Sequence, residues 1–270
     1  MSMIINVPAA PLLLTPHVGG LEDEVLYGSK IDIIEASDYG FSKVMTEYDY
    51  EGYIHNDNFI ELSSVITSLK RHIITSTFAD VMPEPNIKQR AILNLPRGSF
   101  VFGAEKYENG WSRVLLADAS HGYIRSSKIR QWAHITAGEI CEFTFRQNVL
   151  ETAFNYFDAP YRWGGKTPVG IDCSGLAFMA HFLNGITIYR NSSIEHSIEK
   201  GFPTRKVALE DAKMGDLLYF PGHIAIYLGG GRFIHSSHSN DGVAVNSLNA
   251  DDDDFRADLK ETLICAGTVF

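Results

Sequence analysis

The sequence has no excess of positive charge. Among its 270 residues, 23 are lysine or arginine and 33 are aspartate or glutamate, which gives a formal net charge of −10. Proteins that bind nucleic acid or anionic membranes through charge present basic surfaces. No uninterrupted apolar run reaches the roughly 18 residues that a membrane-spanning helix needs. We therefore expect neither nucleic acid nor a membrane among the partners.

Cysteine is also scarce, since the chain has only Cys141, Cys173 and Cys265. Three cysteines cannot all pair, and they are too few for a secreted scaffold held together by disulfides. The first 20 residues lack a basic segment and contain three prolines, which makes them a poor signal peptide. A cytoplasmic location is expected, with an extracellular or cell-wall location as the alternative.

An internal repeat with a spacing of 70 residues runs through the first half of the chain. The recurring pairs are Gly28-Ser29 with Gly98-Ser99, GFSKV at 40–44 with GWSRV at 110–114, and GYI at 52–54 with GYI at 122–124. Short β-rich segments with glycine turns at this pitch are typical of a small barrel of about 60–70 residues, used here twice. The stretch 80–89, DVMPEPNIKQ, has the proline and polar content of a linker between the copies.

After Phe143 the apolar pattern changes to a helical period. A first helix is predicted to end before Pro160, and its apolar positions are Val149, Leu150, Ala153, Phe154 and Phe157. A second helix should begin at Cys173 and end near Gly185. Strands are predicted at 216–220, 223–228 and 231–235, with a turn at 229–231. The C-terminal half is therefore predicted to be α+β, with helices first and an antiparallel sheet after them.

One cysteine and two histidines stand where thiol catalysis needs them. Cys173 opens the second predicted helix, and the positive end of a helix dipole favours thiolate over thiol. His223 lies six residues before Gly229, and His235 lies six residues after it. Across a hairpin they fall opposite or nearly opposite each other and share a face. One imidazole can then take the thiol proton while the second orients the first.

The same residue types also have simpler roles in proteins. Isolated cysteines are commonly small buried apolar residues, which is the interpretation for Cys141 and Cys265. A zinc site would use Cys173, His223, His235 and His238, but it lacks the CxxC or HxxxH spacing of such sites. No metal and no cofactor is therefore expected. The acidic run 251–254 is interpreted as a solvated loop.

Together these motifs resemble the NlpC-type cell-wall cysteine peptidases, in the subgroup with two N-terminal bacterial SH3-like barrels. The motifs are PYRWGGKTPVGIDCSGL at 160–176, MGDLLYF at 214–220 and GHIAIYLGGGRFIHSS at 222–237, behind the 70-residue repeat. The resemblance covers nearly the whole chain. It implies an α+β fold: two small all-β SH3-like barrels (residues 1–79, and 80–138 with the linker), then a papain-like cysteine peptidase domain at 139–270 with helices packed on an antiparallel sheet.

The resemblance also implies catalytic roles. Cys173 matches the nucleophile, His223 the general base and His235 the orienting third member of a Cys-His-His triad. Tyr161, twelve residues before the cysteine, matches a tyrosine that lies beside the nucleophile and helps to hold the oxyanion.

Substrate-binding positions follow from the same resemblance. Asp172 and Ser174 match contacts that flank the cysteine, and Asp172 is a candidate partner for a substrate ammonium. YRNSS at 189–193 resembles a PRDSS stretch that contacts a substrate carboxylate, although Tyr189 and Asn191 depart from that pattern. The full predicted substrate-binding set is Asp172, Ser174, Ser192, Trp163, Tyr50 and Glu24. The last two are candidates from the first barrel to cap the substrate amine, and Glu51 is an equally simple alternative.

The function implied by the resemblance is hydrolysis of the bond between γ-D-glutamate and a diamino acid in peptidoglycan stem peptides, through an acyl-enzyme. Relatives with this barrel arrangement prefer peptides with a free N-terminal L-alanine, L-Ala-γ-D-Glu-diamino acid, as in murein peptide recycling. Two alternatives stay open: a non-catalytic peptidoglycan-binding protein, and an amidase or acyltransferase of the same fold acting on another acyl substrate. The choice between diaminopimelate and lysine is open, as is the oligomeric state.

Overall fold

The 70-residue repeat of the sequence recurs in the strands of the structure. The computed structural model describes residues 2–16, 19–36 and 40–270. In the first copy the repeating strands are β4 (Lys30–Ala36), β5 (Phe41–Thr46), β6 (Glu51–His55) and β7 (Phe59–Glu61). In the second copy they are β11 (Phe100–Lys106), β12 (Trp111–Leu115), β13 (His121–Arg125) and β14 (Ile129–Gln131). Each of these strands starts 70 residues after its counterpart, so the sequence repeat is a structural repeat.

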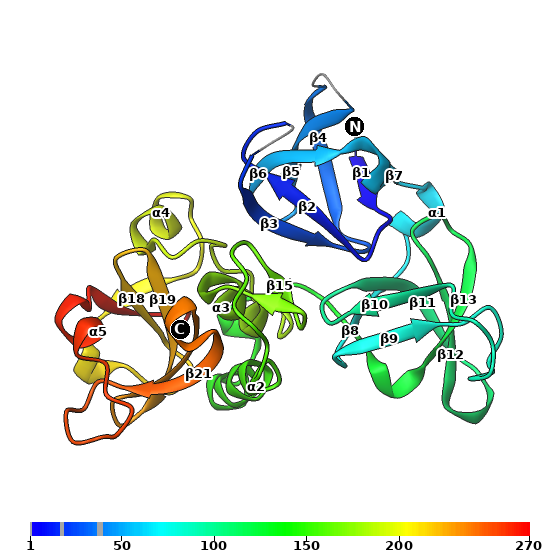
Figure 1. Cartoon of the computed structure of the whole chain (residues 1–270). Coiled ribbons are helices and arrows are strands. Elements are labelled where there is room, and N and C mark those ends of the chain that lie inside the picture. Colours follow the sequence, from blue (N-terminus) through cyan, green and yellow to red (C-terminus); the bar gives the residue numbers. More distant parts are fainter. Residues whose placement is uncertain (1, 17–18, 37–39) are drawn as a thin grey trace. The chain divides into compact units, whose positions relative to one another are not determined.

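The strand order is also shared between the copies. The first copy forms one antiparallel sheet in the order β3-β2-β6-β5-β4-β1-β7, and the second forms β13-β12-β11-β8-β14 beside the hairpin β9-β10. The remaining strands are β1 (Ser2–Ile5), β2 (Ala9–Leu13), β3 (Leu21–Leu26), β8 (Arg71–Ile74), β9 (Phe78–Val81) and β10 (Leu93–Pro96). Figure 1 shows the two copies in blue and in cyan to green. Their assignment as SH3-like barrels stays a prediction.

The segment expected to link the copies lies inside the second one. Asp80 belongs to β9, where it pairs with Asn94 of β10, and the proline-containing chain after it connects these two strands. The copies are joined instead by residues 62–70, which include the short helix α1 (Ser64–Thr67). Proline and polar residues mark a loop in a sequence, but they do not tell which loop it is.

Contacts along the chain divide it into two compact units, Met1–Ala133 and His134–Phe270. The predicted division into three domains stays a prediction, and its first boundary, after residue 79, falls inside β9 (Phe78–Val81). No helix within the described ranges is long and apolar enough to cross a membrane.

The second unit is a six-stranded antiparallel sheet with helices beside it. Its strand order is β17-β22-β18-β19-β20-β21. These strands are β17 (Arg205–Val207), β18 (Leu217–Phe220), β19 (His223–Gly229), β20 (Arg232–Ser237), β21 (Gly242–Ser247) and β22 (Cys265–Thr268). The helices are α2 (Glu142–Phe154), α3 (Cys173–Phe182), α4 (Ile194–Glu199) and α5 (Ala257–Thr262), and a small hairpin pairs β15 (Lys166–Thr167) with β16 (Gly170–Ile171).

Short 3-10 turns connect several of these elements. They span Asn56–Asn58, Glu108–Gly110, Ser126–Lys128, Ala137–Glu139, Leu209–Asp211 and His238–Asn240. The chain as a whole has a mixed, sheet-rich fold with few helices. The description of its second unit as papain-like stays a prediction.

Helix α3 is the buried centre of the second unit. All ten of its residues are buried, and it contacts α2, β19 and β20; Figure 1 shows the two helices in green next to the orange sheet. A second apolar cluster joins Phe220, Phe233 and Leu259, the last from α5. Burying one large apolar side chain contributes roughly 1.5–3 kcal/mol, so α3 is held firmly by its surroundings.

The structure confirms both predicted helices and the three predicted strands. It differs in the buried face of α2, which is formed by Phe145, Arg146, Val149 and Ala153. Phe154 and Phe157 are 45% and 47% exposed. The apolar pattern therefore gave the helix correctly, and of its five positions Val149 and Ala153 lie on the buried face.

Three glycines make the turn between β19 and β20. Gly229, Gly230 and Gly231 have φ of +88°, +58° and +82°, a region that side chains with a Cβ rarely adopt. Ile226 stands opposite Ile234 across this hairpin. The turn therefore fixes which residues of the two strands face each other.

Burial of His181 in α3 predicts a pH-dependent stability. Its ring is 1% exposed and its Nδ1–H donates to the carbonyl of Ala177 at 2.8 Å, while burial lowers its pKa to about 4. Between pH 6.5 and 4 the unfolded chain binds a proton that the folded chain does not. Lowering the pH through this range therefore reduces the free energy of unfolding by up to about 1.4 kcal/mol per pH unit for this group.

The substitution His181→Gln keeps a donor for Ala177 and removes the titration. Urea unfolding, monitored by the hydrogen exchange of α3, measures the stability. Between pH 6.5 and 4 we expect the variant to lose less stability than the unmodified protein. The exposed His196→Gln is the matched control and should leave the slope unchanged. Identical slopes in the unmodified protein and His181→Gln would contradict a neutral His181.

Candidate active site

The start of α3 is fixed by its capping residue, Asp172. This residue has an extended backbone (φ −93°, ψ 178°), and its carboxylate accepts the N–H of Gly175. Cys173 is therefore the first helical residue, and it is 9% exposed. Gly175 has no space for a side chain, because a Cβ there would lie 2.2 Å from the carbonyl oxygen of Gly165. This close approach holds the beginning of the helix against the 164–165 turn.

Asp172 is also one half of a buried ion pair. Arg190, 1% exposed, donates from Nη1 to Asp172 Oδ1 at 3.1 Å and to Ser174 Oγ at 2.8 Å. The N–H of Gly164 donates to Asp172 Oδ2 at 2.8 Å. Breaking a buried pair by removing one partner costs about 3–5 kcal/mol. The carboxylate thus organises the helix start, and the predicted substrate contacts of Asp172 and Ser174 stay predictions.

His223 and His235 are in direct contact. Nε2 of His223 lies 2.7 Å from Nδ1 of His235, and the ring planes are nearly perpendicular at 79°. Continuing the hairpin register puts His235 opposite Ala225, two residues from His223, so the imidazoles meet along a diagonal of the sheet. His235 is buried, and its Nε2 lies 2.9 Å from Oδ1 of Asn246.

The thiol of Cys173 lies at the strand that carries His223. The backbone N–H of Ile224, the residue after His223, forms a hydrogen bond that acts on the pKa of the Cys173 thiol. Helix α3 packs on both β19 and β20. The structure thus brings Cys173 to the beginning of β19, and the two histidines extend from there into the sheet.

Burial decides the charge state of this site. It raises the pKa of Cys173 to about 11, and the nearby Asp172 charge adds to that rise, while hydrogen bonds from Ile224 and Ser174 and the charge of Arg190 lower it by less. The expectation that the helix start favours the thiolate is therefore wrong for the free protein: loss of hydration outweighs the helix dipole.

The histidines shift in the opposite direction for the same reason. Burial lowers the pKa of His223 to about 3 and that of His235 to about 4. At neutral pH the proton therefore resides on sulfur, and both imidazoles are neutral. A neutral His223 is free to accept a proton when the thiol reacts.

Tyr161 lies close to the thiol. Burial, followed by the negative charges of Cys173 and Asp172, raises the pKa of its phenol to about 12. The ring meets His238 edge-on at 6.1 Å between centroids. The phenol keeps its proton at neutral pH and remains a hydrogen-bond donor.

The remaining predicted substrate residues occupy different places. Ser192 is partly exposed and lies between Arg190 and Ser193, the cap of α4. Trp163 is 64% exposed. In the N-terminal unit, the hydroxyl of Tyr50 donates to Glu22 at 3.3 Å, and Glu24 is a buried residue of β3. Their substrate contacts stay predictions.

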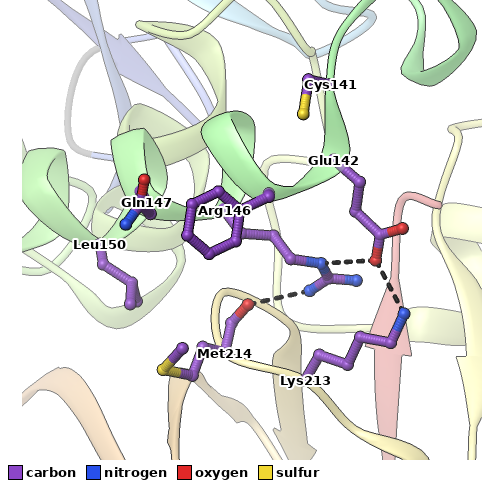
Figure 2. A pocket seen from close by; sticks show the side chains of 8 residues that line it. Cys141, Glu142, Arg146, Gln147, Leu150, Lys213 and Met214 are labelled. Carbon is purple, nitrogen blue, oxygen red and sulfur yellow. Dashed lines mark hydrogen bonds and ion pairs between the residues drawn. The ribbon is translucent and has the colours of Figure 1, made fainter.

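A pocket of about 510 Å³ lies beside α2, and Figure 2 shows the side chains around it. It is lined by Cys141, Glu142, Phe143, Arg146, Gln147, Leu150, Lys213 and Met214. Glu142 accepts from Arg146 Nε at 2.9 Å and from Lys213 Nζ at 3.0 Å. The predicted catalytic residues lie elsewhere.

Cys141, at this pocket, is exposed, so the interpretation of it as a buried apolar residue is wrong. It caps α2, and hydrogen bonds with Thr144 and Phe143 lower the pKa of its thiol. Cys265 is partly buried.

No group of three His, Cys, Asp or Glu side chains in the described parts of the chain could hold a metal ion. The polar groups around Cys173 are its own thiol, the imidazole pair, the Tyr161 phenol and nearby backbone N–H groups.

A thiol at a helix start beside a pair of imidazoles is the arrangement of a thiol hydrolase, and comparison with known proteins gives the family. Residues 158–253 match the NlpC/P60 family. The chain is similar over its whole length to dipeptidyl-peptidase 6 of Lysinibacillus sphaericus, with 38% identity and 100% of both chains covered.

Two further comparisons agree. Gamma-D-glutamyl-L-lysine dipeptidyl-peptidase of Bacillus subtilis (strain 168) is 31% identical over 110 residues, which is 38% of this chain and 36% of the relative. The crystal structure of an NlpC/P60 family protein from Bacillus cereus ATCC 10987 has the same fold, with a TM-score of 0.81, 18% identity and 98% of both chains covered. The chain belongs to the NlpC/P60 family and is a cysteine peptidase.

Two residues of the site were missed by sequence reasoning. Arg190 was considered only as part of YRNSS, and no sequence signal links it to Asp172, 18 residues earlier. Asn246 lies in VAVNS, where strand alternation puts it on the same face as Ala244. That alternation could have placed an amide near His235.

The two thiols should react in the order of their exposure and pKa. With iodoacetamide at about pH 7.5, we expect Cys141 to be alkylated before Cys173, because the thiolate is the reactive form. Peptide mass mapping of a time course measures both rates, and Cys141→Ser isolates the slower one. Faster labelling of Cys173 than of Cys141 at neutral pH would show that the free enzyme holds a thiolate.

Proposed function

We propose that this peptidase hydrolyses the bond between γ-D-glutamate and the diamino acid of peptidoglycan stem peptides. The relatives support this substrate, since one is named a gamma-D-glutamyl-L-lysine dipeptidyl-peptidase and another a dipeptidyl-peptidase. Two observations carry the proposal. His223 lies 2.7 Å from His235, and His223 begins the strand that meets Cys173. A Cys-His-His triad accounts for both observations.

Acylation begins with the neutral pair. As Sγ of Cys173 bonds to the γ-glutamyl carbonyl carbon, the thiol proton moves to His223, and His235 stabilises the imidazolium through its acceptor nitrogen. The tetrahedral intermediate collapses, the C–N bond breaks, and His223 gives its proton to the leaving amine of the diamino acid. A thioester on Cys173 remains.

Deacylation repeats the proton transfers with water. His223 takes a proton from a water molecule that attacks the thioester carbonyl, and the C–S bond then breaks. The proton returns to sulfur, and L-Ala-γ-D-Glu is released as the acid. Each half-reaction returns His223 to the neutral state. The lowered pKa of His223 suits this cycle, because a protonated His223 then gives its proton up readily.

Negative charge on the carbonyl oxygen needs donors that are already in place. The N–H of Cys173 at the helix start is one, and the Tyr161 phenol, with its raised pKa, is a second. Loss of one such donor costs about 3–4 kcal/mol of transition-state stabilisation. This assigns Tyr161 a direct role in rate.

Recognition of a free L-alanine amine requires a carboxylate or equivalent acceptors, because an unpaired buried ammonium is very costly. Asp172 already accepts hydrogen bonds from Gly164, Gly175, Ser174 and Arg190. Asp172 is therefore engaged in holding the helix start, and it is not the acceptor that we propose for the substrate amine. Peptides with a free amine are those released for recycling, and a cytoplasmic location would suit that role.

The peptide L-Ala-γ-D-Glu-diaminopimelate tests the proposal. We expect cleavage to L-Ala-γ-D-Glu, refusal of the N-acetylated peptide, and a loss of at least about 1,000-fold in rate for Cys173→Ser and for His223→Ala. Mass spectrometry of the products measures all three. Cys265→Ser, which changes a thiol outside the site, should keep the unmodified rate.

The alternatives give different outcomes in the same assay. A peptidoglycan-binding protein without catalysis would retain the peptide intact. An acyltransferase would transfer the acyl group to an added amine in place of water. Undiminished hydrolysis by Cys173→Ser would refute the thioester mechanism.

A further inference from the structure

The imidazole pair continues into a third group, the amide of Asn246. This side chain, 7% exposed on β21, lies with Oδ1 2.9 Å from Nε2 of His235. Its Nδ2 donates to the backbone carbonyl of Asp254 at 3.0 Å. The same carbonyl accepts the N–H of Ser247 at 3.1 Å. Both ends of the amide are therefore occupied.

The carbonyl of Asp254 determines which way this amide faces. A carbonyl oxygen only accepts, so the group directed at it must be the NH₂ of Asn246. Oδ1 then faces His235, and Nε2 of that ring must carry a hydrogen. In a neutral imidazole the other nitrogen is an acceptor, so Nδ1 of His235 accepts the hydrogen on Nε2 of His223.

Nδ1 of His223 is the one ring nitrogen whose hydrogen is still to be assigned. With Nε2–H of His223 donated to His235, the lone pair of His223 lies on Nδ1. This is the atom that must receive the thiol proton. The tautomers of both rings thus follow, one step at a time, from a single backbone carbonyl.

We propose that Asn246 is a positioning residue that sets the tautomers of His235 and His223, so that Nδ1 of His223 is the catalytic base. This inference rests on the proposed function for its kinetic consequences. A reversed amide would set the Asn246 side-chain oxygen against the carbonyl oxygen of Asp254, so that two acceptors would face each other.

The acidic run holds the anchoring carbonyl in place. Arg232 pairs with Asp254 at 2.5 Å and with Asp252 at 3.5 Å, and the N–H of Arg256 donates to the carbonyl of Ser247 at 2.8 Å. Part of the run interpreted as a solvated loop therefore braces the end of β21. Because Arg232 is 44% exposed, its pairs add little alone, and the backbone bonds carry most of the restraint.

The charge around His235 comes from several elements. Besides His223 and Asn246, Arg256 lowers the pKa of His235, whereas Asp258 and the side chain of Asn240 raise it. A carboxylate at position 246 would add a negative charge at the shortest distance. It would raise the pKa of the imidazole pair while still accepting from Nε2–H, and it would lose the hydrogen bond to the carbonyl of Asp254.

Three variants test the inference. Asn246→Leu removes the acceptor; we expect kcat to fall by about 10- to 100-fold with KM within about twofold. Asn246→Asp keeps an acceptor; it should recover most of kcat and move the acidic limb of the kcat/KM profile to higher pH. Asn249→Asp, the same change three residues away on an exposed amide that donates to Gly230, is the matched control and should leave both unchanged.

A second readout is independent of the substrate. Nitrogen NMR of histidine-labelled protein should show hydrogen on Nε2 and a bare Nδ1 in both rings, and a mixture of tautomers in Asn246→Leu. Hydrogen on Nδ1 of His235, or an unmodified kcat and pH profile for Asn246→Leu, would overturn the inference. Absence of γ-glutamyl hydrolysis with the expected tautomers would instead reject the proposed function alone.

Discussion

The site depends on one buried carboxylate, that of Asp172. A charge removed from water must be paired and hydrogen-bonded, and Asp172 meets both conditions through Arg190 and three donors beside the helix start. These donors come from the 164–165 turn, from the first turn of α3 and from the chain before α4. One ion pair therefore ties together the three segments that surround Cys173, and the position of the thiol follows from it.

Burial of these groups also sets the chemistry. The same loss of hydration that raises the pKa of Cys173 lowers that of His223, so the resting pair is neutral and the proton moves during the reaction. A neutral pair needs the correct tautomer more than it needs charge, and Asn246 together with the carbonyl of Asp254 supplies it. In this account the enzyme controls where a proton can go rather than keeping a charged nucleophile ready.

Local pattern predicted much of this. The spacing of 70 residues predicted the repeated strands because glycine turns recur wherever the backbone needs them, and the Gly229–Gly231 turn placed His223 and His235 on one face. Long-range features were not predictable in the same way. The partner of Asp172 lies 18 residues away, and that pairing has no periodic signal. The partner of His235 lies 11 residues away, and strand alternation gives its face but not the contact. The protonation state of Cys173 was also mispredicted. The helix dipole can be inferred from the local sequence, whereas the burial of Cys173 depends on how the whole sheet packs.

The central claim is that Cys173 carries the γ-glutamyl group during turnover. Acid quenching of the enzyme during hydrolysis of L-Ala-γ-D-Glu-diaminopimelate, followed by peptide mass mapping, tests it most directly. We expect an adduct of L-Ala-γ-D-Glu, less one water, on the peptide that contains Cys173. An adduct on Cys141 or Cys265, or full hydrolysis by enzyme whose Cys173 is completely alkylated, would contradict the account.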